Sequence, residues 1–217
     1  IPTVQGIRSP GGIGVNHLGD MFLSDNQGTW NGTSSLKHLK PGSFQGSPVG
    51  KWAKKALLNG QEPPTPKDKS RIILERERIK NFTPPAVNFP HGIVANSPTG
   101  FVYDGSKGAF GPFENQLFVN DQFYSNVTRV YLEEIKGVYQ GVCFPFRKGF
   151  RSGNVPSVMN HENGSIFIGG TNRGWGSIGK ENFALERLDW TGVVPFEIHK
   201  VNITKDGFKL TFTKKIN

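Results

Sequence analysis

Three segments of this 217-residue chain repeat one pattern, in which a turn is followed by three or four apolar or aromatic residues and then by a small polar loop. The repeated segments are residues 19–28, 115–122 and 163–174. Their aligned phenylalanines, Phe22, Phe118 and Phe167, are separated by 96 and 49 residues, so the first interval is close to twice the second. A repeat period of about 40 to 50 residues is typical of β-propeller blades. The spacing therefore predicts a β-propeller whose function lies in loops at one face.

The composition favours an all-β chain of this kind. Glycine (28 residues) and proline (15 residues) are frequent, and short apolar runs between turn-forming residues indicate strands joined by turns. No run approaches the ~18 apolar residues of a membrane-spanning helix, so we expect no transmembrane segment. The start, residues 1–4, has neither an initiator methionine nor a signal-peptide pattern, which is typical of a processed or truncated piece.

The strand pattern divides the chain into two parts. Residues 1–192 predict about three to four four-stranded blades, and residues 141–190 hold four apolar runs that predict the clearest of them. Residues 41–90 break the rhythm with proline and lysine clusters, which predicts an insertion with a short helix at 49–58 and a strand or helix at 72–79. Residues 193–217 predict a terminal β-hairpin that packs on the propeller, closes its ring or starts a β-sandwich module.

The formal net charge of +9 is unevenly distributed. Its densest cluster lies in the insertion and consists of Lys51, Lys54, Lys55, Lys67, Lys69, Arg71, Arg76, Arg78 and Lys80. The charge therefore characterises the insertion more than a binding surface, and we expect no nucleic-acid partner. One alternative remains open, in which the segment from Lys51 to Lys80 binds an anionic ligand with an affinity that falls as salt is added.

The sequence lacks the common short motifs that bind a metal ion or attach a haem. Its single cysteine, Cys143, excludes an internal disulfide, a CxxC metal site and a CxxCH haem attachment. No HxH, HExxH or EF-hand spacing occurs, so we expect no metal ligands that are close in sequence.

The polar loops that follow the repeated strands are the candidate ligand site. Tryptophan beside amide and guanidinium groups suits carbohydrate, because an indole covers the C–H face of a sugar while the polar groups form directed hydrogen bonds. The substrate-binding candidates are Asn26, Gln27, Trp30, Gln122, Asn172, Arg173 and Trp175. The alternative is that these Asn and Gln residues form turns and that the tryptophans pack between sheets.

One histidine is the candidate acid or base. His91 occupies a strand entry shaped by Pro90 and Gly92, where an imidazole can exchange protons with a ligand. The alternative is an ordinary surface histidine. His17 and His161 lie in predicted hairpin turns and are expected to be solvated.

Several segments resemble a family of secreted bacterial propellers, the glucose/sorbosone dehydrogenase-like proteins, also described as membrane-bound dehydrogenases. The matching segments are residues 97–100, 110–119, 126–130, 169–177 and 185–192. The resemblance implies a secreted, periplasmic or cell-surface location, a six-bladed ring, and a longer chain that often carries a c-type haem domain and β-sandwich modules. It also implies sugar oxidation with pyrroloquinoline quinone and calcium, a histidine base, and arginines that hold the quinone. The chain departs from that pattern, because residues 9–14 and 153–158, where the family histidine would stand, contain none.

Two functions follow as hypotheses. The first is a carbohydrate-directed secreted propeller, related to quinone-dependent sugar dehydrogenases, in which His91 abstracts a proton while a sugar hydroxyl is oxidised. The second is a non-catalytic propeller that binds a glycan or assembles with a protein of a surface complex. In both cases we expect the remainder of the same polypeptide, or another chain, to complete the propeller, since exposed sheet edges invite pairing.

Overall fold

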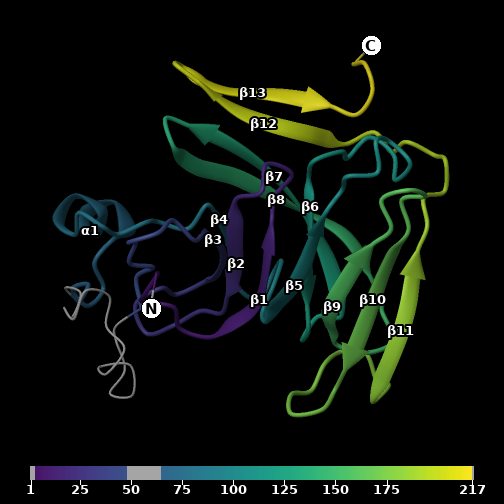
Figure 1. The fold of residues 1–217 in the computed structure, drawn as a ribbon, viewed down its shortest axis with the longest axis horizontal. Helices are drawn as coiled ribbons and strands as arrows, with labels where there is room; N and C mark the ends of the chain where they lie inside the picture. Colours follow the sequence, from purple (N-terminus) through teal and green to yellow (C-terminus); the bar gives the residue numbers. More distant parts are fainter. Residues whose placement is uncertain (1–2, 48–64, 217) are drawn as a thin grey trace.

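The computed structural model describes residues 3–47 and 65–216, which form successive antiparallel blades (Figure 1). Blade 1 contains β1 (Pro10–Val15), β2 (Met21–Asp25), β3 (Ser34–His38) and β4 (Val87–Phe89). Blade 2 contains β5 (Pro98–Tyr103), β6 (Leu117–Asp121), β7 (Asn126–Ile135) and β8 (Val138–Lys148). Blade 3 contains β9 (Asn154–Met159), β10 (Ile166–Thr171) and β11 (Phe183–Leu188). The inner strands β1, β5 and β9 are neighbours, so the predicted all-β class and blade architecture are confirmed.

The three aligned phenylalanines occupy equivalent positions on the second strand of each blade. Phe22 is fully buried in the apolar cluster between blades 1 and 2, and Phe118 is 1% exposed in the cluster between blades 2 and 3. Phe167 is 38% exposed, because alternation along β10 directs Ile166 and Ile168 toward blade 2 and Phe167 to the opposite face. No described blade covers that face.

One predicted blade assignment is wrong. The sequence placed residues 141–146 in the third blade, whereas β8 pairs with β7 along its whole length and is the outer strand of blade 2. Lys136 and Gly137 join the two strands with φ values of 53° and 77°, the left-handed geometry that a two-residue hairpin loop requires. Lys-Gly is a weaker hairpin signal in a sequence than Asn-Gly or Asp-Gly. Because β8 belongs to blade 2, the described blade 3 has three strands where four were predicted.

The insertion lies between β3 and β4, which pair with each other, and it packs on the outside of blade 1 (Figure 1). Residues 72–79, for which strand and helix were both open, contain the helix α1 (Ile72–Arg78). Ile79, Phe44 and Phe82 form its buried apolar cluster. The helix predicted at residues 49–58 lies outside the described residues.

The predicted terminal hairpin is present as β12 (Ile198–Thr204) and β13 (Gly207–Phe212). Its two-residue loop is Lys205–Asp206. Figure 1 shows the hairpin beside β7 and β8, and the Asn202 side chain donates hydrogen bonds to the Tyr131 hydroxyl and to Glu133, both at 2.8 Å. None of the helices in the described part of the chain has the length and apolar character to span a membrane.

Tyr139 joins blade 2 to blade 1. Its hydroxyl donates a hydrogen bond to the Asp20 carboxylate and accepts one from the Asn16 amide at 3.0 Å. Its ring packs edge-on against Phe22 and His38, with centroid distances of 5.0 and 4.9 Å. Burial, together with the hydrogen bond to Asp20, raises the pKa of Tyr139 to about 12.

This raised pKa predicts a specific loss of stability at alkaline pH. The fold favours the protonated phenol, so its contribution is complete below the ordinary pKa of 10 and is lost as the pH rises toward 12. Urea unfolding at several pH values should therefore show a steeper decline between pH 10 and 12 in the wild type than in Tyr139→Phe. Tyr124→Phe is the control, because Tyr124 lies in the loop after β6, where its backbone N–H binds Asp121. An identical slope in wild type and Tyr139→Phe would contradict the assignment.

Candidate functional site

One end of the blades gathers the loops that follow the repeated strands. We call this end the loop face; it consists of residues 25–34, 121–126 and 171–183 with the strand-entry segment 90–97. Hydrogen bonds join the second and third of these loops, from Ile178 N–H to the Phe123 carbonyl at 2.8 Å and from Gly179 N–H to Ser125 Oγ at 2.9 Å. The sequence-predicted loops around Gln122 and Asn172 are therefore neighbours in the structure.

Two aspartates of these loops fix the entry of the inner strands. Asp25 and Asp121 each stand three residues after an aligned phenylalanine. The Asp25 carboxylate accepts hydrogen bonds from the N–H of Ser9, at 2.7 Å, and of the residue before it. The Asp121 carboxylate likewise accepts hydrogen bonds from the N–H of Ser97, at 2.6 Å, and from the N–H of the residue before Ser97. Burial raises the pKa of Asp121 despite these bonds. Sequence reasoning missed this role, although a Ser-Pro pair precedes both inner strands.

The predicted amide ligands bind the loops themselves. The Asn26 side chain donates to the Ser9 carbonyl at 3.0 Å, and Gln27 accepts a hydrogen bond from Ser34 Oγ at 3.2 Å. Gln122 donates to the Thr171 carbonyl at 3.4 Å, and Asn172 donates to the Gly179 carbonyl at 2.7 Å. These four side chains therefore shape the loop face, as turn-forming residues do.

The two candidate tryptophans have different environments. Trp30 packs on Phe82 with a centroid distance of 5.5 Å, and its Nε1–H donates to the carbonyl of Ser70 at 3.1 Å. Trp175 is 78% exposed at the tip of the loop between β10 and β11. Blade symmetry predicted equivalent roles, but the insertion covers Trp30 and leaves Trp175 available to a ligand.

The exposed residues of this region form what we call the loop-face platform: Phe123, Arg173, Trp175 and Ile178. All four are exposed, and the bond between Ile178 N–H and the Phe123 carbonyl ties the two contributing loops together. The base of the loop of residues 171–183 is fixed further, because the Ser177 hydroxyl donates a hydrogen bond to the Asn172 side chain. The platform combines aromatic surface with a guanidinium group, which is the chemistry of a carbohydrate contact.

His91 lies in the strand-entry segment of the loop face. Its side chain is exposed, and its backbone forms a bridge with Ala95. Among the described residues, no hydrogen bond orients its imidazole, so the structure gives it no partner of the kind that a general base uses. His17 and His161 are also exposed, as expected of hairpin turns.

Two carboxylates of the loop face do not fit the calcium ion that accompanies such a quinone. The carboxylates of Asp25 and Asp121 are already bound to backbone amides, and Asp25 also binds Lys37. Within residues 3–47 and 65–216, no three His, Cys, Asp or Glu side chains lie close enough together to hold a metal ion.

The fold matches that of sugar dehydrogenases, although no protein-family model and no curated protein matches the sequence. One solved structure with a similar fold is that of a Thermus thermophilus protein described as an oxidoreductase (glucose dehydrogenase). Its sequence is 16% identical to this chain, and the TM-score is 0.54. Another is the PQQ-bound aldose sugar dehydrogenase of Streptomyces coelicolor, with 15% identity and a TM-score of 0.51. Each alignment covers 86% of this chain and 46% or 45% of the other.

This chain therefore has the β-propeller fold of these enzymes and spans less than half of the length of either. The resemblance drawn from the sequence is confirmed at the level of the fold.

Proposed function

We propose that this chain is part of a secreted, carbohydrate-directed β-propeller that binds a glycan on its loop face. The observation that carries the proposal is Trp175, a large aromatic side chain held mostly in solvent on a loop whose base is fixed by hydrogen bonds. An exposed tryptophan of this kind is informative because most large apolar side chains are buried. Arg173 supplies directed donors beside it.

Replacing Trp175 with alanine should weaken glycan binding at least tenfold, which corresponds to about 1.4 kcal/mol. The reason is that the indole supplies the apolar surface that a sugar ring covers, while the fold does not depend on it. Isothermal titration with oligosaccharides selected on a glycan array measures the effect. Phe208→Ala is the matched control, because Phe208 is an exposed aromatic residue of the terminal hairpin. Equal losses in both variants, or no glycan bound by the wild type, would refute the proposal.

A second candidate function is quinone-dependent oxidation of a sugar hydroxyl, which the fold of the solved neighbours favours. In this case His91 is the only predicted base. Dye reduction should be measured with added pyrroloquinoline quinone, calcium and a panel of sugars, in wild type, His91→Ala and the control His17→Ala. Turnover lost only in His91→Ala supports this function, and absence of turnover together with retained glycan binding favours the binding role.

We also propose that another propeller blade packs on the exposed face of blade 3. Phe167, Val158, Leu185 and Phe183 share that face, as their strand pairing shows, and all four are exposed. In blades 1 and 2, the next blade covers the equivalent face and buries Phe22 and Phe118. The same packing on Phe167 would come from the remainder of a longer polypeptide or from another chain.

The uncovered face predicts self-association of the isolated chain. Exposed contiguous apolar patches promote association, so sedimentation velocity should show a mass above 23.9 kDa that rises with concentration. The double variant Phe167→Glu and Leu185→Glu should remain monomeric, while Ile203→Glu, on the terminal hairpin, should behave as the wild type. A wild type that stays monomeric at high concentration would count against this contact.

A further inference from the structure

A cavity of about 360 Å³ lies at the opposite end of blade 1 from the loop face. The end of β3, the segment 40–43, α1, the segment 80–84 and the β7–β8 turn enclose it. Its volume is near the lower end of the roughly 300–1,000 Å³ range of small-molecule sites. The cavity is therefore large enough for a molecule of about the size of a single sugar.

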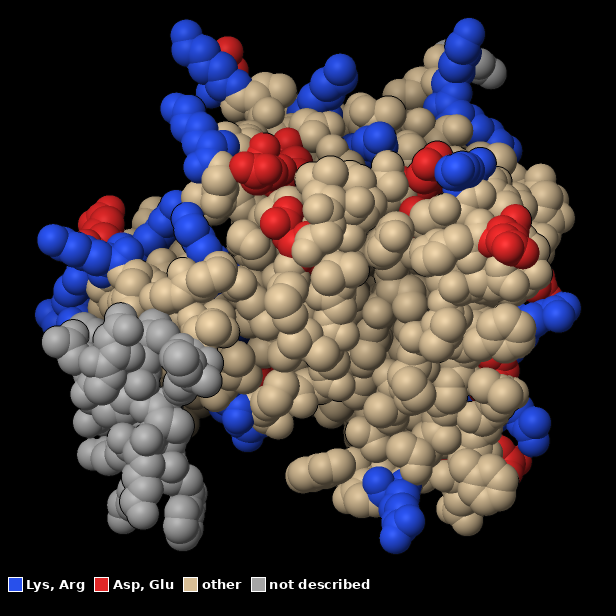
Figure 2. All heavy atoms as spheres, in the orientation of Figure 1, with Lys and Arg blue, Asp and Glu red and all other residues tan. Residues whose placement is uncertain are grey.

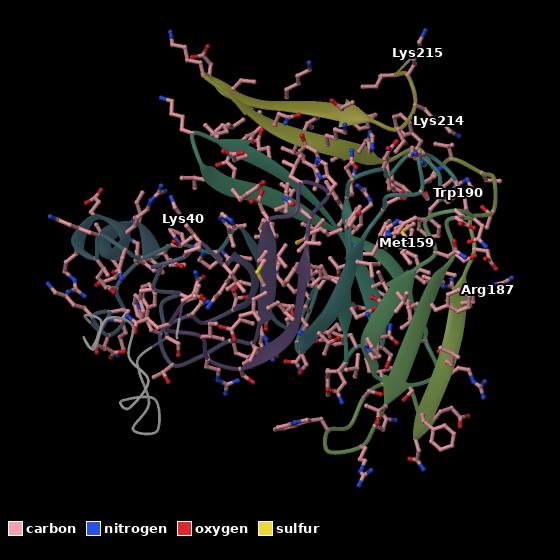
Figure 3. The ribbon with its side chains drawn as sticks, in the orientation of Figure 1. Lys40, Met159, Arg187, Trp190, Lys214 and Lys215 are labelled. Atoms are coloured by element: carbon pink, nitrogen blue, oxygen red, sulfur yellow. The ribbon has the colours of Figure 1, made fainter. Side chains whose placement is uncertain are left out.

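Three cations line this cavity, and none of its described lining residues is Asp or Glu. Lys40 follows β3, Arg76 belongs to α1, and Lys80 follows the helix. Figure 2 shows Lys and Arg side chains gathered around the helix at the left of the view, and Figure 3 places Lys40 between α1 and blade 1. Within the described part of the chain, no ion pair neutralises these three side chains. Their positive charge is therefore available to a ligand.

Three carboxylates on the elements around the cavity already hold other partners. Asp20 accepts the hydrogen bond of Tyr139, and Glu134 accepts one from Gly137 N–H at 2.9 Å. Glu75 of α1 is buried and paired with Arg78. Burial lowers the pKa of His38, which also lines the cavity, so the positive charge at neutral pH belongs to the lysines and the arginine.

The remaining walls are partly apolar. Phe82 is held by its contacts with Phe44 and Trp30, and Tyr139 is held by its hydrogen bonds to blade 1. Ser43 and Thr83 add neutral polar groups. Aromatic walls together with three cations suit a ligand that has an oxyanion and a compact body.

We propose that this cavity is a binding site for a small acidic molecule, whose carboxylate, sulfate or phosphate group is held by Lys40, Arg76 and Lys80. The site is separate from the loop face, so it does not depend on the glycan proposal. Two of the charges of the insertion, Arg76 and Lys80, then act with Lys40 at one cavity.

The test is isothermal titration with glucuronate, glucose 6-sulfate and glucose 6-phosphate, with glucose as the neutral probe. We expect at least one acidic sugar to bind, glucose to bind at least tenfold more weakly, and the affinity to fall as salt is added. The acidic probe that binds best identifies which of the three oxyanions the site prefers. If none of the acidic probes binds, or if glucose binds equally well, the proposal is overturned.

The variants Lys40→Gln, Arg76→Gln and Lys80→Gln should each weaken binding of the acidic sugar at least fivefold. All three side chains are exposed, so the fold should survive, and near-ultraviolet circular dichroism checks this. Lys67→Gln is the matched control, because Lys67 is an exposed lysine of the same insertion that does not line the cavity. If Lys67→Gln weakens binding as much as the others, the attraction is a general effect of net charge and the site is refuted. Glycan binding lost in Trp175→Ala but retained in these variants would keep the two sites distinct.

Discussion

Arg129→Ala is expected to reduce the free energy of unfolding by about 3 kcal/mol, because it removes a buried guanidinium and leaves its hydrogen-bond acceptors unpaired. Arg129 is 1% exposed and donates hydrogen bonds to Gln116 Oε1, to Glu197 at 2.8 Å and to the Ile198 carbonyl at 2.8 Å. Its guanidinium lies over Phe113, with 4.5 Å to the ring centroid. Without it, the buried Gln116 oxygen loses its donor, and the terminal hairpin loses the hydrogen bonds from Arg129 to Glu197 and to the Ile198 carbonyl.

The hairpin should therefore become detached before the blades unfold. Urea unfolding gives the total loss of stability, and limited proteolysis should show cleavage in residues 193–197 at lower urea in the variant than in the wild type. Arg129→Lys should recover little, because an ammonium group cannot reproduce the fork of donors or the stacking of a guanidinium.

The chain contains a matched control for this prediction. Arg187 occupies the position in blade 3 that Arg129 occupies in blade 2, since each pairs with an aligned phenylalanine across the sheet. Arg187 is half exposed, and its partner Asp189 is 2.8 Å away. Figure 3 shows it at the end of β11, near Trp190. Exposed pairs contribute little, so Arg187→Ala should cost less than about 1 kcal/mol. Equal costs for the two arginines would contradict the structural explanation.

The repeat in the sequence predicted the blades because it reflects packing. A phenylalanine recurs where the second strand of a blade meets the next blade, and burial of Phe22 and Phe118 requires that spacing. The blade to which β8 belongs could not be predicted in the same way. Strand pairing depends on the turn that joins the strands, and Lys136-Gly137 has no strong hairpin signature. The apolar runs therefore indicated strands without indicating their partners.

The candidate site was predicted in part for the same reason. Loops that follow equivalent strands meet at one face, so their position followed from the repeat. The exposure of each side chain did not follow from the repeat, because exposure depends on residues that are distant in sequence. Trp30 is covered by the insertion, whereas nothing described covers Trp175. The cavity beside α1 is similarly formed by segments that only the fold brings together.

Asp25→Asn should also cost about 3–5 kcal/mol, because it leaves the buried ammonium of Lys37 without its counter-charge. Both side chains are almost fully buried, and Lys37 Nζ lies 2.7 Å from Asp25 Oδ2. Burial lowers the pKa of Lys37, because desolvation disfavours its charged form. Asparagine keeps one oxygen acceptor but places an NH2 group where the other carboxylate oxygen accepts a backbone N–H, so the substitution removes the charge together with one acceptor.

The equivalent residue of blade 2 provides the control. Asp121 also binds backbone amides, but Thr128 stands in its blade where Lys37 stands in blade 1. Burial already raises the pKa of Asp121, so a neutral side chain is tolerated better there, and Asp121→Asn should cost clearly less than Asp25→Asn. A double-mutant cycle completes the test by urea unfolding. In a Lys37→Met background, Asp25→Asn should cost clearly less than in the wild type, because no buried ammonium remains. If the cost of Asp25→Asn is the same in both backgrounds, the aspartate acts only through the backbone amides, and the ion pair does not hold blade 1 together.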